Sequence, residues 1–159
     1  MTKTYILATE NEQETINLGI VMAKVFLDQV ICVSGDLGSG KTHLAKGLAQ
    51  GLGIEKHVTS PTFNILNVYQ NKNKSFYHMD AYRITDEEMI YDIDTSELLE
   101  PKGISLIEWA ENIDFILPDT CVNVYIEKTD KEEKRIFYIT SDIESIERMA
   151  GIVYENTLR

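Results

Sequence analysis

The chain has 159 residues, of which 43% are hydrophobic, and its 15 Lys and Arg against 26 Asp and Glu give a formal net charge of −11. This composition is typical of a globular protein, and we expect one domain, residues 1–159, that folds without disulfides or structural metals. An acidic surface repels phosphate backbones, so direct binding to nucleic acid is not expected.

The first elements predicted along the chain are a strand, a helix and a second strand. The segment Lys3–Ala8 has the composition of a strand, and Thr9–Glu12 ("TENE") has capping-box spacing, which predicts that a helix follows. The apolar positions of that helix are Ile16, Ile20, Ala23 and Leu27. The β-branched run Val30–Ser34 is typical of a strand that is buried on both faces.

The segment that follows, Gly35–Thr42 ("GDLGSGKT"), fills every position of the pattern G-x-x-x-x-G-K-[ST]. Its glycines allow the backbone to turn so that successive N–H groups point into one concavity, which favours a polyphosphate at the start of a helix. The ammonium of Lys41 can reach the β- and γ-phosphates, and the hydroxyl of Thr42 can ligate Mg²⁺. The predicted nucleotide-binding residues here are Asp36, Leu37, Gly38, Ser39, Gly40, Lys41 and Thr42.

The remaining chain alternates further helices and strands. A helical stripe runs from Leu44 to Leu52 and is ended by glycines, and strands 63–70 and 75–80 form a predicted hairpin. A capping box at Thr85–Glu88 opens a short helix, and 103–109 contains an apolar strand. Strands 121–127 and 135–140 form a second predicted hairpin, and Ser141 caps a last helix.

The order of these elements predicts the fold class. Strands and helices alternate in the first half of the chain, which implies crossover connections and a parallel core, and the two hairpins add antiparallel strands. We therefore expect an α/β, three-layer P-loop NTPase fold with a mixed sheet, in which antiparallel strands flank a parallel core.

Two acidic residues end apolar strands, Asp80 after "SFYHM" and Glu108 after "ISLI". Ligands of such folds lie at the carboxyl ends of the strands, and a P-loop needs a carboxylate for Mg²⁺ and a group that orients the attacking water. Both acids are therefore candidate catalytic residues beside Lys41. The residues alone do not say which acid is nearer the metal.

A third candidate group lies in Thr59–Phe63 ("TSPTF"), where the residue before Pro61 is biased toward extended geometry. Such a loop can present Thr62 as a sensor of the γ-phosphate, or it can be a stiff connector. His78 and Asp80 share one face of their strand, so His78 is either a structural residue or a hydrogen-bond partner near the site. Trp109 is either a core residue or a half-exposed aromatic for a base or a partner.

Several patterns are missing. A GTP-specific N-K-x-D element is absent, which leaves ATP as the expected nucleotide. Cys32 and Cys121 lie in apolar runs without metal-ligand spacing, so both are predicted to be buried thiols. No run resembles a signal peptide or a membrane span, which predicts a cytoplasmic location and no membrane partner.

With these residues in view, the chain resembles the TsaE (formerly YjeE) family of bacterial P-loop ATPases from the first strand to about Glu127. The motifs that carry the resemblance are "GDLGSGKT", "SPTF" (60–63), "HMDAYR" (78–83) and "IEWAE" (107–111). The resemblance implies an ATPase that supports N6-threonylcarbamoyladenosine formation at position 37 of tRNA, in association with the TsaB–TsaD heterodimer.

The resemblance also implies a role for each matching position. Lys41 and Thr42 act on phosphate and Mg²⁺, Glu108 is the acid at the metal, and Asp80 is a second acid needed for activity. Thr62 is implied as the switch-like threonine and Trp109 as the aromatic beside the nucleotide. Thr9 is implied as a nucleotide contact, against its alternative as a helix cap.

Two other functions fit a P-loop. A small kinase that phosphorylates a metabolite usually carries an arginine-rich lid, whereas this chain has four arginines, Arg83, Arg135, Arg148 and Arg159. A non-catalytic nucleotide sensor would lose binding on Lys41→Ala and keep its function on Glu108→Gln. The ATPase hypothesis instead predicts weak hydrolysis by the isolated chain and a change on adding TsaB and TsaD.

Overall fold

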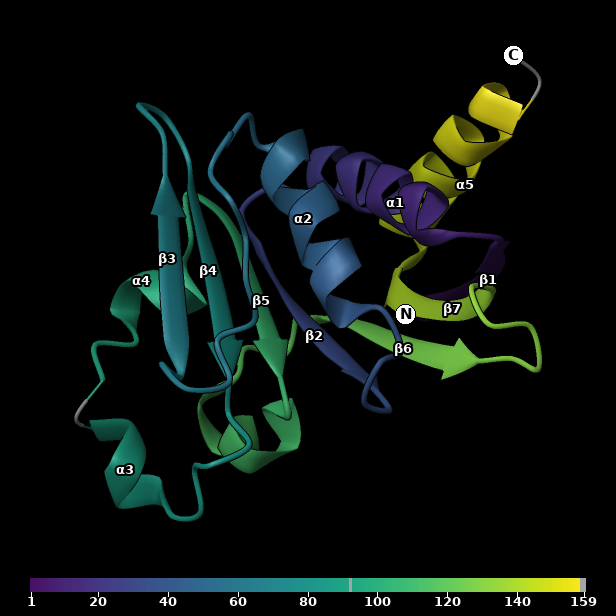
Figure 1. Ribbon diagram of the computed structural model, residues 1–159. Coiled ribbons are helices and arrows are strands. Elements are labelled where there is room, and N and C mark those ends of the chain that lie inside the picture. The colour runs from purple at the N-terminus through teal and green to yellow at the C-terminus, as the bar shows by residue number, and fades with distance from the viewer. Residues whose placement is uncertain (92, 158–159) are drawn as a thin grey trace.

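The computed structural model describes residues 1–91 and 93–157, which form one seven-stranded sheet with helices on both faces (Figure 1). The elements in chain order are β1 (Thr2–Thr9), α1 (Glu12–Val25), β2 (Gln29–Gly35), α2 (Lys41–Gly51), β3 (Leu66–Gln70), β4 (Ser75–Asp80), α3 (Glu87–Tyr91), α4 (Ser96–Leu99), β5 (Gly103–Glu108), the 3₁₀ helix η1 (Ala110–Ile116), β6 (Val122–Lys128), β7 (Arg135–Asp142) and α5 (Ile143–Thr157). Among the described residues, no helix combines the length and the apolar character that crossing a membrane requires.

The sheet is mixed, with strand order β1-β7-β6-β2-β5-β4-β3. Strands β6, β2, β5 and β4 are parallel to one another, while β3 pairs with β4, and β7 with β6 and β1, in antiparallel fashion. Both predicted hairpins are therefore present. The fold class is confirmed, because the antiparallel strands lie on either side of the parallel core.

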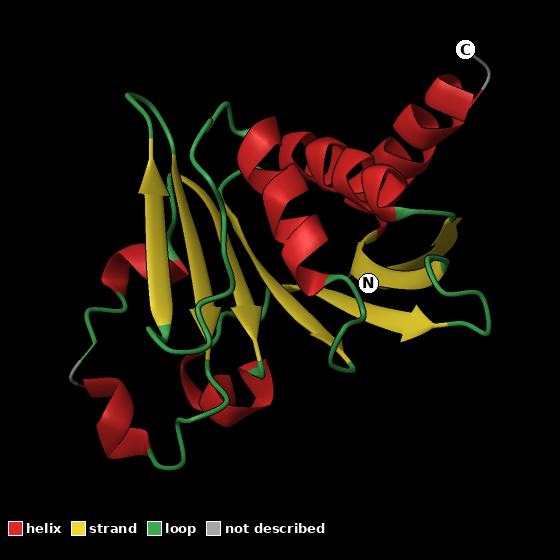
Figure 2. Cartoon of the chain, in the orientation of Figure 1, coloured by secondary structure: helices red, strands yellow, loops and turns green. Residues whose placement is uncertain are grey.

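Helices lie on both faces of the sheet and make three layers (Figure 2), and a hydrophobic cluster fills the contact on each face. The larger one packs α1, α2 and α5 on one face of the sheet, with Met22, Leu48 and Met149 among its fully buried side chains. The smaller one packs α3, α4 and η1 on the other face, with Ile90 and Ile113. The parallel strands are apolar on both faces because both faces are covered there.

Helix α1 corrects the predicted apolar stripe. Its buried positions include Leu18, Met22 and Ala23, whereas Ile16 and Ile20 are only half-buried and Leu27 lies beyond the helix and is exposed. Helix α1 packs on α2 as well as on the sheet, so its apolar surface is wider than one stripe. At the α1–α2 contact, a Cβ on Gly19 would lie 2.8 Å from the Cα of Gly47, so the two backbones approach as closely as glycine permits.

The predicted helix caps at Thr9, Thr85 and Ser141 are wrong by one or two residues. The capping side chains are Asn11, which accepts the N–H of Glu14 at 2.9 Å, Asp86, which accepts that of Met89 at 3.1 Å, and Asp142, which accepts that of Ser145 at 2.8 Å. Thr9 and Ser141 are instead the last or near-last residues of β1 and β7 and are paired across the sheet. Strand pairing therefore extends past the predicted cap, and the next Asn or Asp starts the helix.

The two cysteines are free thiols on neighbouring parts of the sheet, Cys32 in β2 and Cys121 just before β6. Cys32 is buried as predicted, whereas Cys121 is only half-buried. A hydrogen bond between the two side chains raises the pKa of Cys32, to which burial adds, and lowers the pKa of Cys121.

Candidate functional site

The loop between β2 and α2 forms the floor of the site. Gly35, Gly38 and Gly40 have φ values of 151°, 78° and 106°, and Gly40 is the N-cap residue of α2. Residues other than glycine rarely adopt these backbone conformations. The first N–H groups of α2 have no partners within the helix. The loop and the helix N-terminus together suit an anion.

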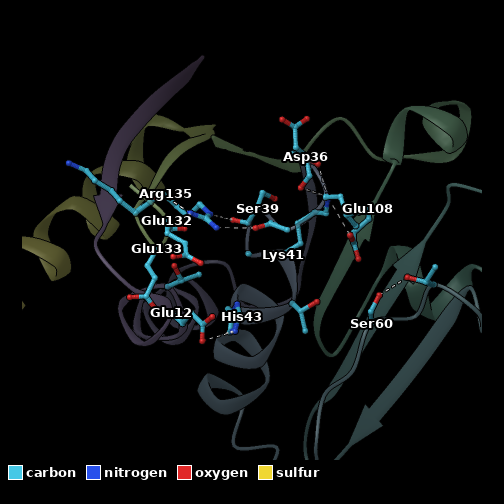
Figure 3. Close-up of a pocket in the computed structure, with 18 of the residues that line it drawn as sticks. Glu12, Asp36, Ser39, Lys41, His43, Ser60, Glu108, Glu132, Glu133 and Arg135 are labelled. Carbon is cyan, nitrogen blue, oxygen red and sulfur yellow. Dashed lines mark hydrogen bonds and ion pairs between the residues drawn. The ribbon is translucent and has the colours of Figure 1, made fainter. Parts of the chain in front are cut away.

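A cavity of about 1090 Å³ opens over this loop (Figure 3). It is lined by every residue that the sequence proposed for the site except Thr9, namely Asp36, Leu37, Gly38, Ser39, Gly40, Lys41, Thr42, Thr62, Asp80, Glu108 and Trp109. These residues come from α2, β4, β5 and three loops. The structure thus brings together groups that lie far apart in the chain.

Lys41, the first residue of α2, points back under the loop. Its Nζ donates to the carbonyl oxygen of Gly35 at 2.6 Å and to that of Asp36 at 3.5 Å, and lies 3.9 Å from Oε1 of Glu108. The ammonium is therefore held by carbonyl dipoles and one carboxylate. A polyphosphate in the cavity can compete for this ammonium, because phosphate oxygens carry negative charge whereas the carbonyl oxygens of Gly35 and Asp36 are neutral.

Glu108 and Asp80 lie side by side at the carboxyl ends of neighbouring parallel strands. They are partners in the β4–β5 register, and Glu108 is also the partner of Val33 at the end of β2. Glu108 is buried, at 7% exposure, while Asp80 is half-buried and its Oδ1 accepts the N–H of Tyr82 at 3.0 Å. Two oxygen donors thus face the same cavity.

Trp109 and Tyr82 form an aromatic rim on this side of the cavity. Their ring centroids lie 5.0 Å apart at 59°, and Trp109 and Tyr82 are 43% and 59% exposed. Trp109 has the left-handed backbone angles φ 57° and ψ 41°, which turn the chain from β5 into η1. Of the two alternatives for Trp109, the half-exposed aromatic describes its position.

Thr62 lines the cavity from the loop before β3. Its Oγ1 is hydrogen-bonded to Oγ of Ser60 at 2.7 Å, and both side chains are exposed. The same loop is anchored to the acidic strand end, because the N–H of Asp80 donates to the carbonyl oxygen of Ile65 at 2.7 Å. The Thr62 hydroxyl therefore lies at the cavity. Among the described contacts, Ser60 is its single hydrogen-bond partner, so no other group holds it away from a ligand.

Thr9 lies outside the cavity. It is buried, and its Oγ1 is hydrogen-bonded to Oγ1 of Thr15 at 2.8 Å. Thr15 lines the cavity, and Thr9 lies behind it. Its neighbour Glu10 lines the cavity instead. A residue in the last position of β1 points to one side only, and the chain turns toward the cavity just after it.

The sequence reasoning missed the β6–β7 loop, Lys131–Lys134, and Arg135, which form the opposite wall. Arg135 donates from Nε to the carbonyl oxygen of Ser39 and from Nη2 to that of Gly38, both at 3.0 Å. Its Nη1 holds the carbonyl oxygens of Glu132 at 2.7 Å and Lys134 at 2.9 Å. Nothing local in "KTDKEEKR" signals this contact, since Ser39 lies 96 positions away.

His43 and Glu12 add a second wall, with Nε2 of His43 3.3 Å from Oε2 of Glu12. No group of three or more His, Cys, Asp and Glu within residues 1–91 and 93–157 is arranged to hold a metal ion. The cavity offers Thr42, Asp80 and Glu108 as oxygen donors, which is the donor type that Mg²⁺ prefers. Mg²⁺ usually takes only one or two protein ligands beside substrate phosphates, so this set fits it.

Comparison with known proteins agrees with these motifs. The model of the family described as "Threonylcarbamoyl adenosine biosynthesis protein TsaE" matches residues 9–137. A tRNA threonylcarbamoyladenosine biosynthesis protein TsaE from Treponema pallidum is 38% identical over 73% of this chain and 86% of its own length. The protein of the same name from Bacillus subtilis is 39% identical over 69% of this chain and 68% of its own.

The fold has a solved counterpart in the crystal structure of Bacillus subtilis YdiB, with a TM-score of 0.78 and 29% identity. That match covers 99% of this chain and 98% of YdiB. The matched family region begins at the end of β1 and ends in β7, so it includes the whole cavity from the P-loop to Arg135. On these grounds, the chain belongs to the TsaE family.

Proposed function

We propose that this protein binds ATP with Mg²⁺, hydrolyses it, and through this activity serves threonylcarbamoyladenosine formation in tRNA. The observation that carries the proposal is the cavity in which Lys41, Thr42, Asp80 and Glu108 meet above the P-loop glycines. The tRNA role rests on family membership and on the printed names of the relatives.

The residues divide the work by position. The loop amides bind the phosphate chain, and Lys41 exchanges the carbonyl oxygens of Gly35 and Asp36 for phosphate oxygens. Glu108 is the proposed metal ligand. The support is that its Oε1 lies 3.9 Å from the ammonium of Lys41, the group proposed to hold the phosphates that a metal would also bind. Bound Mg²⁺ would neutralise charge that develops on the phosphates. Asp80, the neighbour of Glu108 in the sheet, is left to orient the attacking water.

The proposed partners are the TsaB and TsaD proteins. The cavity is open on the side of Leu37, which is 94% exposed, and of the Tyr82–Trp109 rim. A site open to water hydrolyses ATP poorly, because water weakens the electrostatic stabilisation that the fixed groups provide. A protein that covers this side would complete the site, so we expect weak hydrolysis by the chain alone.

The test is calorimetry and phosphate release, with and without TsaB and TsaD. The wild-type protein should bind ATP in the presence of magnesium and release inorganic phosphate faster with the partners. Glu108→Gln should retain ATP and release phosphate about 100-fold more slowly. The matched control is Glu111→Gln, because Glu111 is exposed on η1 and does not line the cavity.

Three results would contradict the proposal. The first is that titration of ATP with magnesium produces no heat. The second is that Glu108→Gln releases phosphate at the normal rate in the assembled complex. The third is that the phosphoryl group is transferred to a metabolite and is not released as phosphate. The last result would support a kinase. Normal tRNA modification in cells that carry only Glu108→Gln would support a sensor.

A further inference from the structure

A histidine that the proposed mechanism does not use lies directly behind the buried acid. His78 is on β4 with 0% of its surface exposed, and its Nε2 lies 2.8 Å from Oε2 of Glu108. Its other ring nitrogen, Nδ1, is buried and is without a hydrogen-bond partner in the described structure. The ring therefore has a single polar contact, and that contact is the carboxylate of the site.

The sheet register explains the contact. His78 lies two residues before Asp80 on β4, so both side chains are on the same face of the strand. In the β4–β5 register, Asp80 pairs with Glu108 and His78 pairs with Leu106. To reach His78, the Glu108 side chain therefore leans back along the sheet by one such pair. The ring of Phe76, a member of the core cluster, lies 6.0 Å from that of His78, so the imidazole packs beside an aromatic ring of the core.

The contact gives the two oxygens of Glu108 different tasks. When Glu108 is ionised its carboxylate can only accept, and Nε2 of His78 is then the donor in this contact. Oε2 is thereby engaged by the buried ring of His78, while Oε1 lies 3.9 Å from Nζ of Lys41. A free glutamate would sample several rotamers, whereas this one has one oxygen fixed.

We propose that His78 is a positioning residue, which fixes Glu108 so that Oε1 is presented to the nucleotide cavity. This inference rests on the proposed ATPase function and deepens it. A histidine that merely fills the core would matter for stability alone. A positioning histidine must in addition act on turnover, and only through Glu108.

The first experiment compares His78→Leu with His78→Gln. Leucine removes the donor, whereas the glutamine amide can place an N–H near the position of Nε2. In the complete complex we expect His78→Leu to lower kcat about 10- to 100-fold, the range found when a partner that orients a metal-binding group is lost, with KM for ATP nearly unchanged. His78→Gln should recover most of the rate. The control is His57→Leu, because His57 is exposed in a loop away from the cavity and should keep the wild-type rate.

The second experiment is a double-mutant cycle with Glu108→Gln. If His78 acts through Glu108, adding His78→Leu to Glu108→Gln should cause little further loss of kcat. Independent, multiplying losses would overturn the inference, as would an unchanged kcat in His78→Leu alone or an equally inactive His78→Gln that is still folded by thermal unfolding.

A measurement on the resting wild-type protein needs neither turnover nor a folded leucine variant. Nitrogen-15 NMR of the histidine side chains should show a proton on Nε2 of His78, the nitrogen that faces Glu108. Glu108→Ala should shift that proton resonance, and a ring without a proton on Nε2 would overturn the inference. The two proposals fail separately. No phosphate release by the wild type contradicts the ATPase function, whereas normal release with an unaffected His78→Leu contradicts only the role of His78.

Discussion

Lys41 and Glu108 form an ion pair that is nearly closed off from water, with side-chain exposures of 15% and 10%. Removing one member of such a pair leaves the other charge without compensation, so each substitution also disturbs its partner. The carbonyl oxygens that hold Lys41 belong to the P-loop itself, which links the lysine to the loop conformation before any nucleotide arrives. Single residues in this site are therefore coupled.

At this scale we expect Lys41→Ala to lower the affinity for ATP or its turnover by about 100-fold or more, because the chain loses the ammonium that lies at the P-loop. Calorimetry and phosphate release measure the two effects separately. Lys46→Ala is the control, since Lys46 is on the same helix and does not line the cavity. Comparable losses in both variants would show that the effect comes from helix α2 and not from the ammonium.

The packing of helix α1 against helix α2 positions the site. Helix α1 sets the place of α2 through the contact of Gly19 with Gly47, and a Cβ on Gly47 would overlap the carbonyl oxygen of Ile16. The P-loop runs directly into α2, because Lys41 is the first residue of that helix, so the position of the helix also sets the position of the loop. The spacing of the two helices thus decides where the loop amides lie.

We expect Gly47→Ala to lower the free energy of unfolding by about 1–3 kcal/mol, as overpacking does, and to weaken ATP binding. Denaturant unfolding and calorimetry provide the two values. Gly151→Ala is the matched control, because a Cβ there meets nothing within 4 Å on exposed α5, and it should be neutral or slightly stabilising. An unchanged Gly47→Ala protein would mean that α1 and α2 separate freely.

Helix α5 depends on its Asp142 cap. The backbone N–H of Ser145 donates to this carboxylate and lowers the pKa of Asp142. Because the folded-state pKa is depressed, the charged cap stabilises the protein above the unfolded-state pKa, and this stability is lost as the pH falls through the folded-state pKa. The pH dependence of the stability that this cap contributes is therefore confined to acidic pH.

Asp142→Ala should cost about 1 kcal/mol of unfolding free energy at pH 7, and the difference from wild type should shrink below pH 4. Urea unfolding at several pH values measures this. Asp142→Asn retains an acceptor and lacks the charge, so its cost relative to wild type should be smaller at pH 7 and should also shrink as the wild-type carboxylate is protonated. A difference between wild type and Asp142→Ala that stays constant down to pH 2 would contradict the assignment of the cap.

On the scale of the whole molecule, one arginine joins the two halves of the site. Arg135 is the first residue of β7 and connects the β6–β7 loop to the P-loop through carbonyl oxygens of both. The guanidinium fork can do this because its donors have fixed directions, whereas an ammonium cannot match them.

We expect Arg135→Lys to weaken ATP binding about tenfold, although charge is conserved, because the bonds to Gly38 and Ser39 are lost together. Calorimetry provides the affinity. The control is Arg148→Lys, since Arg148 donates to the carbonyl oxygen of Val25 and neither residue lines the cavity. Equal affinity of Arg135→Lys and wild type would show that the P-loop holds its shape unaided.

The sequence by itself determined the parts of this protein whose signals are local. The P-loop is one continuous motif, Asp80 and Glu108 end strands that are recognisable from their composition, and both hairpins follow from apolar runs around polar turns. The mixed sheet follows from the order of these elements. The helix caps were missed narrowly, because several Ser, Thr, Asn and Asp residues compete there and strand pairing decides among them.

Only the tertiary structure decided which distant residues complete the site. The bond from Arg135 to Ser39 spans 96 positions, and that from His78 to Glu108 spans 30. Neither leaves a periodic or spaced pattern, because each depends on which strands become neighbours and on their register. Likewise, only the structure shows that Thr9 is buried against Thr15 and does not line the cavity.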